Sequence, residues 1–193
     1  IRQTHCPDPG KRRYGEVKQI VLTGTGGQGL ILAGIILAEA AVLDGKQAIQ
    51  TQSYGPEARG GSSRAEVIIA DEPIDYPKVL KADTLLAMSQ EAFDKYGKGV
   101  GAEASLVVDS TFVRELSETK AKIVSLPITK AAKDELGRDM FANIIALGAI
   151  VGLTKTVSRE SLVAAVLARV PKGTEDKNRK AIDIGFDLIK KAQ

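Results

Sequence analysis

The chain has 193 residues, of which 44% are hydrophobic and 26% charged, the composition of an ordinary globular domain. Its formal charge of +3 is small and its basic residues are spread along the chain, so neither nucleic acid nor a membrane surface is an expected partner. No apolar run reaches the roughly 20 residues that cross a bilayer, and the single cysteine, Cys6, excludes an internal disulfide and favours a reducing cytoplasm.

The first sixteen residues differ from the rest. They hold Pro7, Pro9, Gly10 and a basic cluster at 11–13, and they lack the apolar run and small-residue cleavage site of a secretory signal. This composition predicts a flexible N-terminal lead over residues 1–16. The remainder, 17–193, has the length of one domain.

The first half of that domain alternates between strand and helix patterns. An apolar run at 17–22 predicts a strand, the nearly uncharged stretch 28–43 predicts a core helix that stops at Asp44, and 48–52 predicts a second strand. Residues 63–70 alternate between apolar and polar, which predicts a strand with one wetter side near a sheet edge.

Short apolar runs at 84–88, 105–108 and 122–125 predict central parallel strands, with helices at about 90–96 and 128–135 between them. Strands that alternate with helices in this way indicate an α/β fold. We expect a doubly wound, Rossmann-like and mostly parallel sheet with helices on both faces.

The last third of the chain is predicted to be helical. Residues 140–153 form an apolar core helix, Ser158 is a good N-cap for the next helix, and Pro171 ends it. Thr174 starts the final helix, whose apolar face is most simply part of the core.

A glycine-rich loop lies between the first strand and the first helix, at Gly24, Gly26, Gly27, Gln28 and Gly29. Its G-x-G-x-x-G spacing lets the backbone turn tightly and approach a ligand, and the following helix aims its free N–H groups at an anion. Glycines in this arrangement also serve strand-to-helix packing alone, so both interpretations stay open.

The residues around this loop do not identify a particular nucleotide as the ligand. A dinucleotide site usually carries an acidic residue at the end of the second strand, and the stretch 48–52 has none. Leu30 and Ile31 stand where a phosphate-binding P-loop would have a Lys and a Ser or Thr.

A second motif follows the second predicted strand, at residues 52–63. Its glycines and Pro56 favour a loop, while Tyr54, Glu57 and Arg59 supply an aromatic ring, a carboxylate and a forked cation. Loops that leave the carboxyl ends of strands gather on one edge of such a sheet. We therefore expect the two motifs to face each other.

At these motifs the sequence resembles the gamma subunit of the 2-oxoacid:ferredoxin oxidoreductases, which also occurs as one domain of single-chain pyruvate:ferredoxin oxidoreductases. The sequence of residues 53–62 is more similar to the 2-oxoglutarate branch than to the pyruvate branch, although pyruvate or another 2-oxoacid stays open as the substrate. The resemblance runs from Val17 to the end of the chain and is carried by residues 24–29, 54–61, 64–75, Asn143, 146–148, Asn178, Ala181 and Gly185.

The resemblance implies a role within a larger enzyme. Such enzymes decarboxylate a 2-oxoacid oxidatively on thiamine diphosphate, pass electrons through iron–sulfur clusters to ferredoxin, and transfer the acyl group to coenzyme A. It implies alpha, beta and ferredoxin-like delta subunits as partners, which carry most of the thiamine diphosphate, Mg and clusters. This chain alone would hold no cofactor and would help to enclose the active site.

The resemblance also implies roles for individual residues. The glycine loop would face an anion, with Gln28 offering its amide to a phosphate, a thiamine or a partner's backbone. The shared cleft would be lined by Tyr54, Glu57, Arg59 and Gly60. Two alternatives stay open, because an Arg59–Glu57 pair can simply order the loop and Asn143 is more simply a buried amide that satisfies backbone groups.

The chain lacks the residues of a complete enzyme. Its one histidine, His5, lies in the predicted lead, Cys6 has no base partner, and no serine sits in a nucleophile-elbow motif. Two rivals to a catalytic subunit remain, a stand-alone nucleotide-binding domain and a non-catalytic scaffold module. A subunit expressed alone is expected to expose an apolar patch, which leaves a homodimer open.

Overall fold

A six-stranded sheet forms the centre of the molecule in the computed structural model, which describes residues 17–54 and 62–193. Its strand order is β2-β3-β1-β4-β5-β6. The neighbouring pairs from β1 to β6 are parallel, whereas β3 runs antiparallel to both β1 and β2. The strands are β1 (Lys18–Thr25), β2 (Gln47–Tyr54), β3 (Ser62–Ala70), β4 (Thr84–Ala87), β5 (Ser105–Asp109) and β6 (Lys122–Leu126). The predicted lead of residues 1–16 lies outside the described residues.

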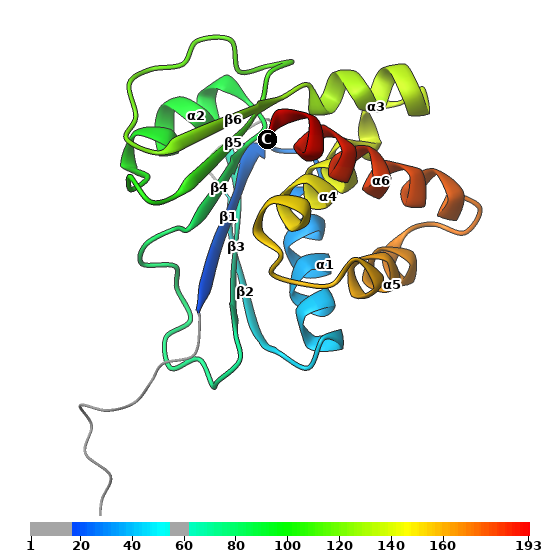
Figure 1. Cartoon of the computed structure of the whole chain (residues 1–193), viewed down its shortest axis with the longest axis horizontal. Helices are drawn as coiled ribbons and strands as arrows, with labels where there is room; N and C mark the ends of the chain where they lie inside the picture. The colour runs from blue at the N-terminus through cyan, green and yellow to red at the C-terminus, as the bar shows by residue number, and fades with distance from the viewer. Residues whose placement is uncertain (1–16, 55–61) are drawn as a thin grey trace, which may run out of the picture.

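Helices cover both faces of the sheet, but unevenly. One face carries most of the helices, while the other is covered by α2 (Figure 1). The helices are α1 (Leu30–Leu43), α2 (Gln90–Tyr96), α3 (Ile128–Leu136), α4 (Ala142–Thr154), α5 (Arg159–Arg169) and α6 (Glu175–Ala192), with short 3-10 turns at Gly97–Gly99 and Asp139–Phe141. The predicted α/β class, a mostly parallel sheet and a helical C-terminal third are confirmed.

The sheet corrects one predicted strand position. β6 is an edge strand and not a central one, with Lys122 and Ser125 exposed. A short apolar run indicates that one face of a strand is buried, but it does not show whether the strand has a neighbouring strand on each side. The strand predicted near an edge, β3, lies one place in from it and is buried along most of its length.

Two glycines let α4 and α6 pack in direct backbone contact. A Cβ atom added at Gly185 would lie 2.2 Å from the carbonyl oxygen of Ile145 and 2.8 Å from the Cα of Gly148. A Cβ added at Gly148 would lie 2.4 Å from the carbonyl oxygen of Ile182. Because α4 fills the space between the sheet and α6, this contact sets the depth at which the outer helix sits.

A carboxylate joins the end of α1 to the start of α5. Asp44 accepts hydrogen bonds from the Ser158 amide (2.5 Å), the Ser158 hydroxyl (2.7 Å) and the Ser161 hydroxyl (2.5 Å). Ser158 in turn caps α5 by accepting from the Ser161 amide, as predicted. Burial alone would raise the pKa of Asp44, but the hydrogen bonds from Ser161 and Ser158 outweigh it and lower that pKa below its ordinary value of 3.8.

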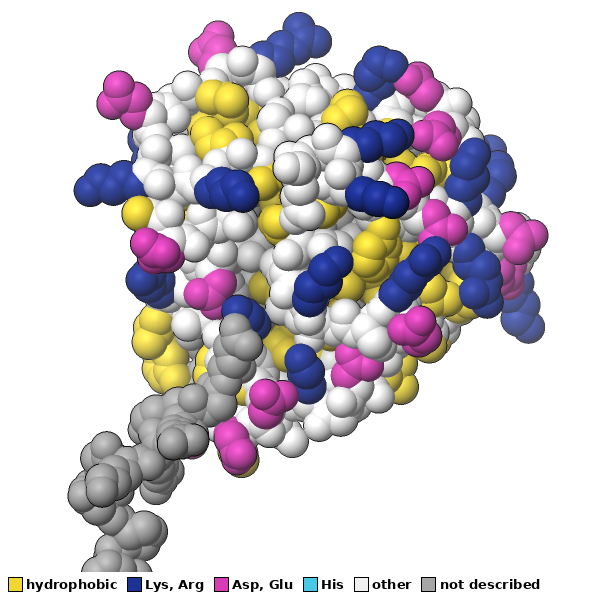
Figure 2. Space-filling view, in the orientation of Figure 1, with side chains coloured by type: hydrophobic (Ala, Val, Ile, Leu, Met, Phe, Trp, Pro, Cys, Tyr) yellow, Lys and Arg dark blue, Asp and Glu magenta, His cyan; other side chains and the backbone are white. Residues whose placement is uncertain are grey.

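Charges of both signs are interspersed over the face seen in Figure 2, without a field of one sign. This distribution agrees with the small net charge of +3. Within the described ranges, no helix is both long and apolar enough to span a membrane.

We predict that Gly185→Ala lowers the free energy of unfolding by about 1–3 kcal/mol, because the new methyl group must push α4 and α6 apart. Urea unfolding followed by circular dichroism would measure it. Gly99→Ala is the control, since a Cβ there meets nothing within 4 Å. Equal stabilities for the two variants would contradict backbone contact between the helices.

We predict that Asp44→Asn costs about 1–2 kcal/mol of stability at neutral pH, because the hydrogen bonds from Ser158 and Ser161 lose their charged acceptor. The folded-state pKa lies below the unfolded one, so this stabilisation is present above the ordinary value of 3.8 and is lost as pH falls through and below it. Urea unfolding across this pH range should show the difference from the parent shrinking. A constant difference, or the same effect from the exposed Asp187→Asn, would overturn the prediction.

Candidate functional site

The glycine turn joins β1 to α1 at the carboxyl edge of the parallel strands. Gly27 and Gly29 have φ angles of 94° and 73°, in the left-handed region that favours glycine. A Cβ on Gly24 would lie 2.2 Å from Oε1 of Gln28. The predicted helix start at residue 28 is wrong by two residues, because left-handed Gly29 is the N-cap and the helix begins at Leu30.

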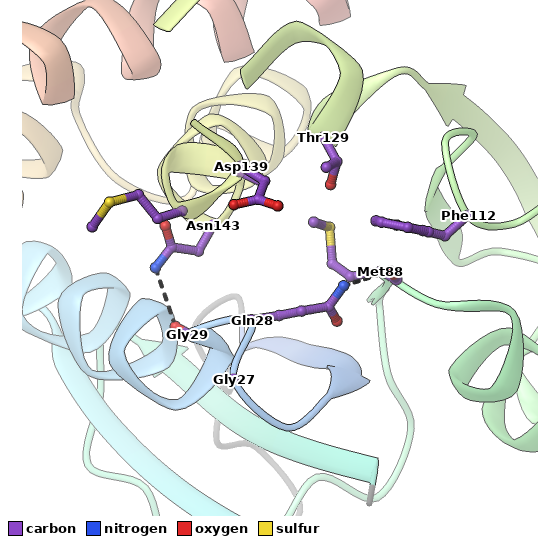
Figure 3. Close-up of a pocket in the computed structure, with 10 residues that line it drawn as sticks. Gly27, Gln28, Gly29, Met88, Phe112, Thr129, Asp139 and Asn143 are labelled. Atoms are coloured by element: carbon purple, nitrogen blue, oxygen red, sulfur yellow. Dashed lines mark hydrogen bonds between the residues drawn. The ribbon is translucent and has the colours of Figure 1, made fainter. Parts of the chain in front are cut away.

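The side chain of Gln28 bridges the ends of two neighbouring strands. Its Oε1 accepts from the backbone N–H of Thr25 at 2.7 Å, and its Nε2 donates to the carbonyl oxygen of Met88 at 2.9 Å (Figure 3). Thr25 ends β1, and Met88 follows β4 directly. Both ends of the amide are thus engaged within the chain, which gives Gln28 a role in positioning the turn. Its contact with a ligand or partner stays a prediction.

Asn143, in the first turn of α4, contacts the same turn. Its Nδ2 donates to the carbonyl oxygen of Gly29 at 3.4 Å, and its Oδ1 accepts from the backbone N–H of Ile144 at 2.9 Å. The side chain is only 7% exposed. A Cβ on Gly29 would lie 2.5 Å from this Nδ2, so α4 and the turn approach closely. Asn143 therefore satisfies backbone groups, the role that its sequence context favours.

A pocket of about 400 Å³ opens beside the turn. Figure 3 shows Asn143 and Asp139 on one side of it, Phe112 and Thr129 on another, and the glycine turn opposite. Phe112 and Met140 are 45% and 57% exposed, which gives the pocket an apolar rim. The lining residues are Gly27, Gln28, Gly29, Met88, Phe112, Thr129, Asp139, Met140, Ala142 and Asn143.

A buried carboxylate fixes the wall of this pocket. Asp109, at the end of β5, is fully buried and accepts from the Thr129 hydroxyl (2.5 Å), the Thr129 amide (3.1 Å) and the Thr111 amide (3.0 Å). Its backbone carbonyl also accepts from the amide of Phe112 at 3.1 Å. Asp109 thus caps the first turn of α3 and holds the loop that carries Phe112.

Sequence reasoning missed these residues, as well as Met88 and Met140. A polar residue directly after a buried parallel strand was the available signal for Asp109, since such positions lie at the ligand-facing edge of α/β sheets. Nothing in the local pattern marked Thr129, which is brought to Asp109 only by the fold.

The second motif begins and ends beside the glycine turn. Tyr54 ends β2 and pairs with Ser63, and Ser63 also pairs with Gly24. The Ser63 hydroxyl lies 3.5 Å from the carbonyl oxygens of both Gly24 and Thr25. The sheet therefore brings the flanks of both motifs to one edge, as expected. Gly26 lies exposed in the turn itself.

Four predicted site positions are not placed in space. Glu57, Arg59 and Gly60 lie outside the described residues, and of Tyr54 the backbone alone is described. The predicted contacts of these residues with a ligand or partner stay predictions.

The described lining of the pocket suits apolar or neutral polar groups. It contains no Lys or Arg, and its one carboxylate, Asp139, lies 3.7 Å from Lys133. No group of three or more potential metal ligands occurs within residues 17–54 and 62–193. A phosphate at this pocket would meet backbone N–H groups of the turn but no cation of the described lining, while the apolar rim fits an uncharged portion of a ligand or of a partner's surface.

The fold and the pocket define an α/β subunit of the Rossmann-like class, with a glycine turn at the carboxyl edge of its sheet. The family model for pyruvate ferredoxin/flavodoxin oxidoreductase matches residues 19–188. The chain belongs to this family.

The KorC and PorC relatives match over most of their length. The 2-oxoglutarate synthase subunit KorC of Methanocaldococcus jannaschii is 49% identical, over 93% of this chain and 98% of the relative. The KorC subunit of Archaeoglobus fulgidus is 41% identical, over 88% and 86%. The pyruvate synthase subunit PorC of Methanothermobacter marburgensis is 32% identical, over 89% and 97%.

Solved structures share the fold. The gamma subunit of a keto/oxoacid ferredoxin oxidoreductase from Geobacter sulfurreducens superimposes with a TM-score of 0.82 at 48% identity, over 91% of this chain and 99% of that one. A 2-oxoglutarate:ferredoxin oxidoreductase from Magnetococcus marinus, solved with 2-oxoglutarate, coenzyme A and succinyl-CoA bound, gives 0.83 over 92% of this chain and 32% of that one. Its identity of 22% makes that likeness one of fold alone.

We predict that Gln28→Ala lowers the free energy of unfolding by about 1–2 kcal/mol, because the amide N–H of Thr25 and the carbonyl of Met88 both lose a partner. Chemical denaturation would measure this loss. Gln193→Ala, which changes an exposed glutamine outside the sheet, is the control. A Gln28→Ala variant as stable as the control would show that the bridge does not hold the turn.

Proposed function

We propose that this chain is the gamma subunit of a multi-subunit 2-oxoglutarate:ferredoxin oxidoreductase. The complex converts 2-oxoglutarate, coenzyme A and oxidised ferredoxin into succinyl-CoA, carbon dioxide and reduced ferredoxin. Its other chains are the alpha, beta and ferredoxin-like delta subunits, and it works in the cytoplasm. Residues 17–193 form the subunit proper in this proposal.

The observation that supports this substrate is a difference in identity among the relatives. Four KorC subunits of 2-oxoglutarate synthases are 41–49% identical to the chain over most of both lengths. Subunits of ketoisovalerate oxidoreductases are 30–31% identical, and subunits of pyruvate synthases 29–32%. The chain thus groups with proteins named for 2-oxoglutarate.

The pocket at the carboxyl edge is the part of the chain that we propose to meet the active site. Its glycine turn, Gly24 to Gly29, and the second motif with Tyr54, Glu57, Arg59 and Gly60 would enclose coenzyme A or the reacting centre. Support comes from the shared edge that holds the turn and both flanks of the second motif. Arg59 would supply the cation that the described lining lacks.

The cofactors of the reaction belong to the assembly in this proposal. Thiamine diphosphate with Mg would supply the chemistry of decarboxylation, and iron–sulfur clusters would supply the path for the electrons. Partner chains would bind these groups. The pocket described above has an apolar rim and no Lys or Arg in its described lining, which fits a wall of the shared cleft better than a binding site for a diphosphate.

We predict that Arg59→Ala raises the KM for coenzyme A of the assembled enzyme about 10- to 100-fold, the equivalent of one charge-assisted hydrogen bond. The parent and variant chains would be co-expressed with the alpha, beta and delta subunits, and coenzyme A-dependent reduction of ferredoxin followed. Phe112→Ala should also impair turnover, because its ring lies at the pocket rim. Tyr76→Ala, at an aromatic ring 52% exposed and far from the pocket, is the matched control.

The outcomes separate the rival functions. Intact complexes with unchanged kinetics for both variants would leave a scaffold subunit, and an Arg59–Glu57 pair that merely orders its loop. A preference for pyruvate or 2-oxoisovalerate would move the enzyme to another branch of the family. An assembly inactive with every 2-oxoacid would remove the proposed function.

A further inference from the structure

The outer side of α1 is apolar although part of it is exposed. Glu39 is its one charged residue, and that carboxylate forms an ion pair with Arg169 of α5. Val42 and Leu43 are 60% and 58% exposed, and Leu32 is 36% exposed. A helix that is apolar all round is ordinarily covered on every side. This one has a side that nothing in the described part of the chain covers.

Helix geometry places the uncovered flank at the edge of the sheet. Gly34 faces the sheet, because a Cβ there would meet Ala65 at 2.9 Å and Gln50 at 3.6 Å. The flank toward α4 and α5 is buried, as those helices pack over the interior of the sheet. The opposite flank therefore borders β2. At helical spacing it carries Ile31, Ile35, Ala38 and Val42, all apolar and none fully buried.

The strand below this flank is an unprotected edge. β2 has eight residues, none of them charged, and every one pairs with β3 without a bulge. Its other side has no strand partner within residues 17–54 and 62–193. The opposite edge, β6, is shorter, exposes Lys122 and is followed by Pro127, which are ordinary devices against unwanted pairing. Within its own eight residues, β2 contains neither a charged side chain nor a proline.

We propose that β2 and the exposed flank of α1 together form an interface for a second copy of this chain. β2 pairs antiparallel with β2 of the partner about a two-fold axis perpendicular to the sheet, so that the two sheets become one. Such an axis leaves both α1 helices on the same face of the joined sheet, and the two apolar flanks then meet across the axis.

One symmetry operation thus covers both exposed features. An isolated strand from another protein would pair with the edge but leave the flank of α1 in water. Among the described residues of this surface, self-association brings no like charges together, because β2 is uncharged and the carboxylate of Glu39 is already paired. Both halves of a two-fold interface must be the same surface, and an uncharged strand beside an apolar helix flank complements itself.

The test uses the full chain and does not depend on the proposed enzymatic function. Sedimentation equilibrium over a range of concentrations should give a dimer for the parent and half that mass for Val42→Lys. Val42 is 60% exposed, so the variant should keep its fold, which far-ultraviolet circular dichroism checks. Leu80→Lys is the control, because Leu80 is 78% exposed but lies between β3 and β4, away from α1, and should remain a dimer.

A second measurement reports on strand pairing itself. In a Cys6→Ser background, single cysteines at Gln50, Thr51 and Gln52 near the middle of β2 should include one that forms a disulfide-linked dimer, since a two-fold axis brings a central residue close to its own copy. Ser125→Cys on β6 should form none. Hydrogen exchange at β2 should be slow in the parent and faster in Val42→Lys.

Three results obtained with the chain alone would overturn the interface. They are a parent chain that stays monomeric at every concentration, a dimer that survives Val42→Lys, and cross-linking through β6 in place of β2. Protection of β2 that appears only when other subunits are bound would assign the edge to one of them and would equally exclude the second copy.

Discussion

The amide of Gln28 holds together the part of the molecule on which the candidate site depends. It accepts from the end of β1 and donates to the residue after β4, so two parallel strands and the glycine turn move as one unit. The bond needs the absence of a side chain at Gly24, where a Cβ would collide with the same amide. Asn143 of α4 donates a hydrogen bond to the carbonyl oxygen of Gly29, so both the strands and α4 contact the turn.

These contacts let a glycine-rich loop shape a pocket whose described lining contains no cation. In a dinucleotide-binding domain the turn cradles a pyrophosphate, and an acidic residue after the next strand fixes the ribose. Here the side-chain amides of Gln28 and Asn143 form hydrogen bonds with the protein's own backbone, and the described lining contains no cation. The chain keeps the geometry of such a turn, and in the function we propose the turn forms a wall of an active site that other chains complete.

The order of elements, the fold class and the two motifs followed from the sequence, because periodicity, capping residues and glycine spacing are local signals. Ser158 as an N-cap and the glycine turn are examples. The Asp109–Thr129 bond did not follow, since its partners lie twenty positions apart and meet only after β5 and α3 pack. The edge position of β6 was missed for a related reason, because a strand's own sequence records burial of its faces and not the presence of a neighbour.

The difference between the burial that a sequence predicts and the neighbours that the fold supplies also applies to α1. Its sequence reads as a core helix, and sequence reasoning treated it as one, yet the structure buries only the sides that face the sheet, α4 and α5. An apolar flank next to an uncharged edge strand is costly for a monomer, because exposed apolar area favours association and an open edge offers unpaired N–H and C=O groups. The sequence of α1 predicts more burial than the described part of the chain provides, and in our proposal a second copy supplies the missing cover. In this molecule the flank and the edge lie side by side, so one partner with matching geometry supplies it for both.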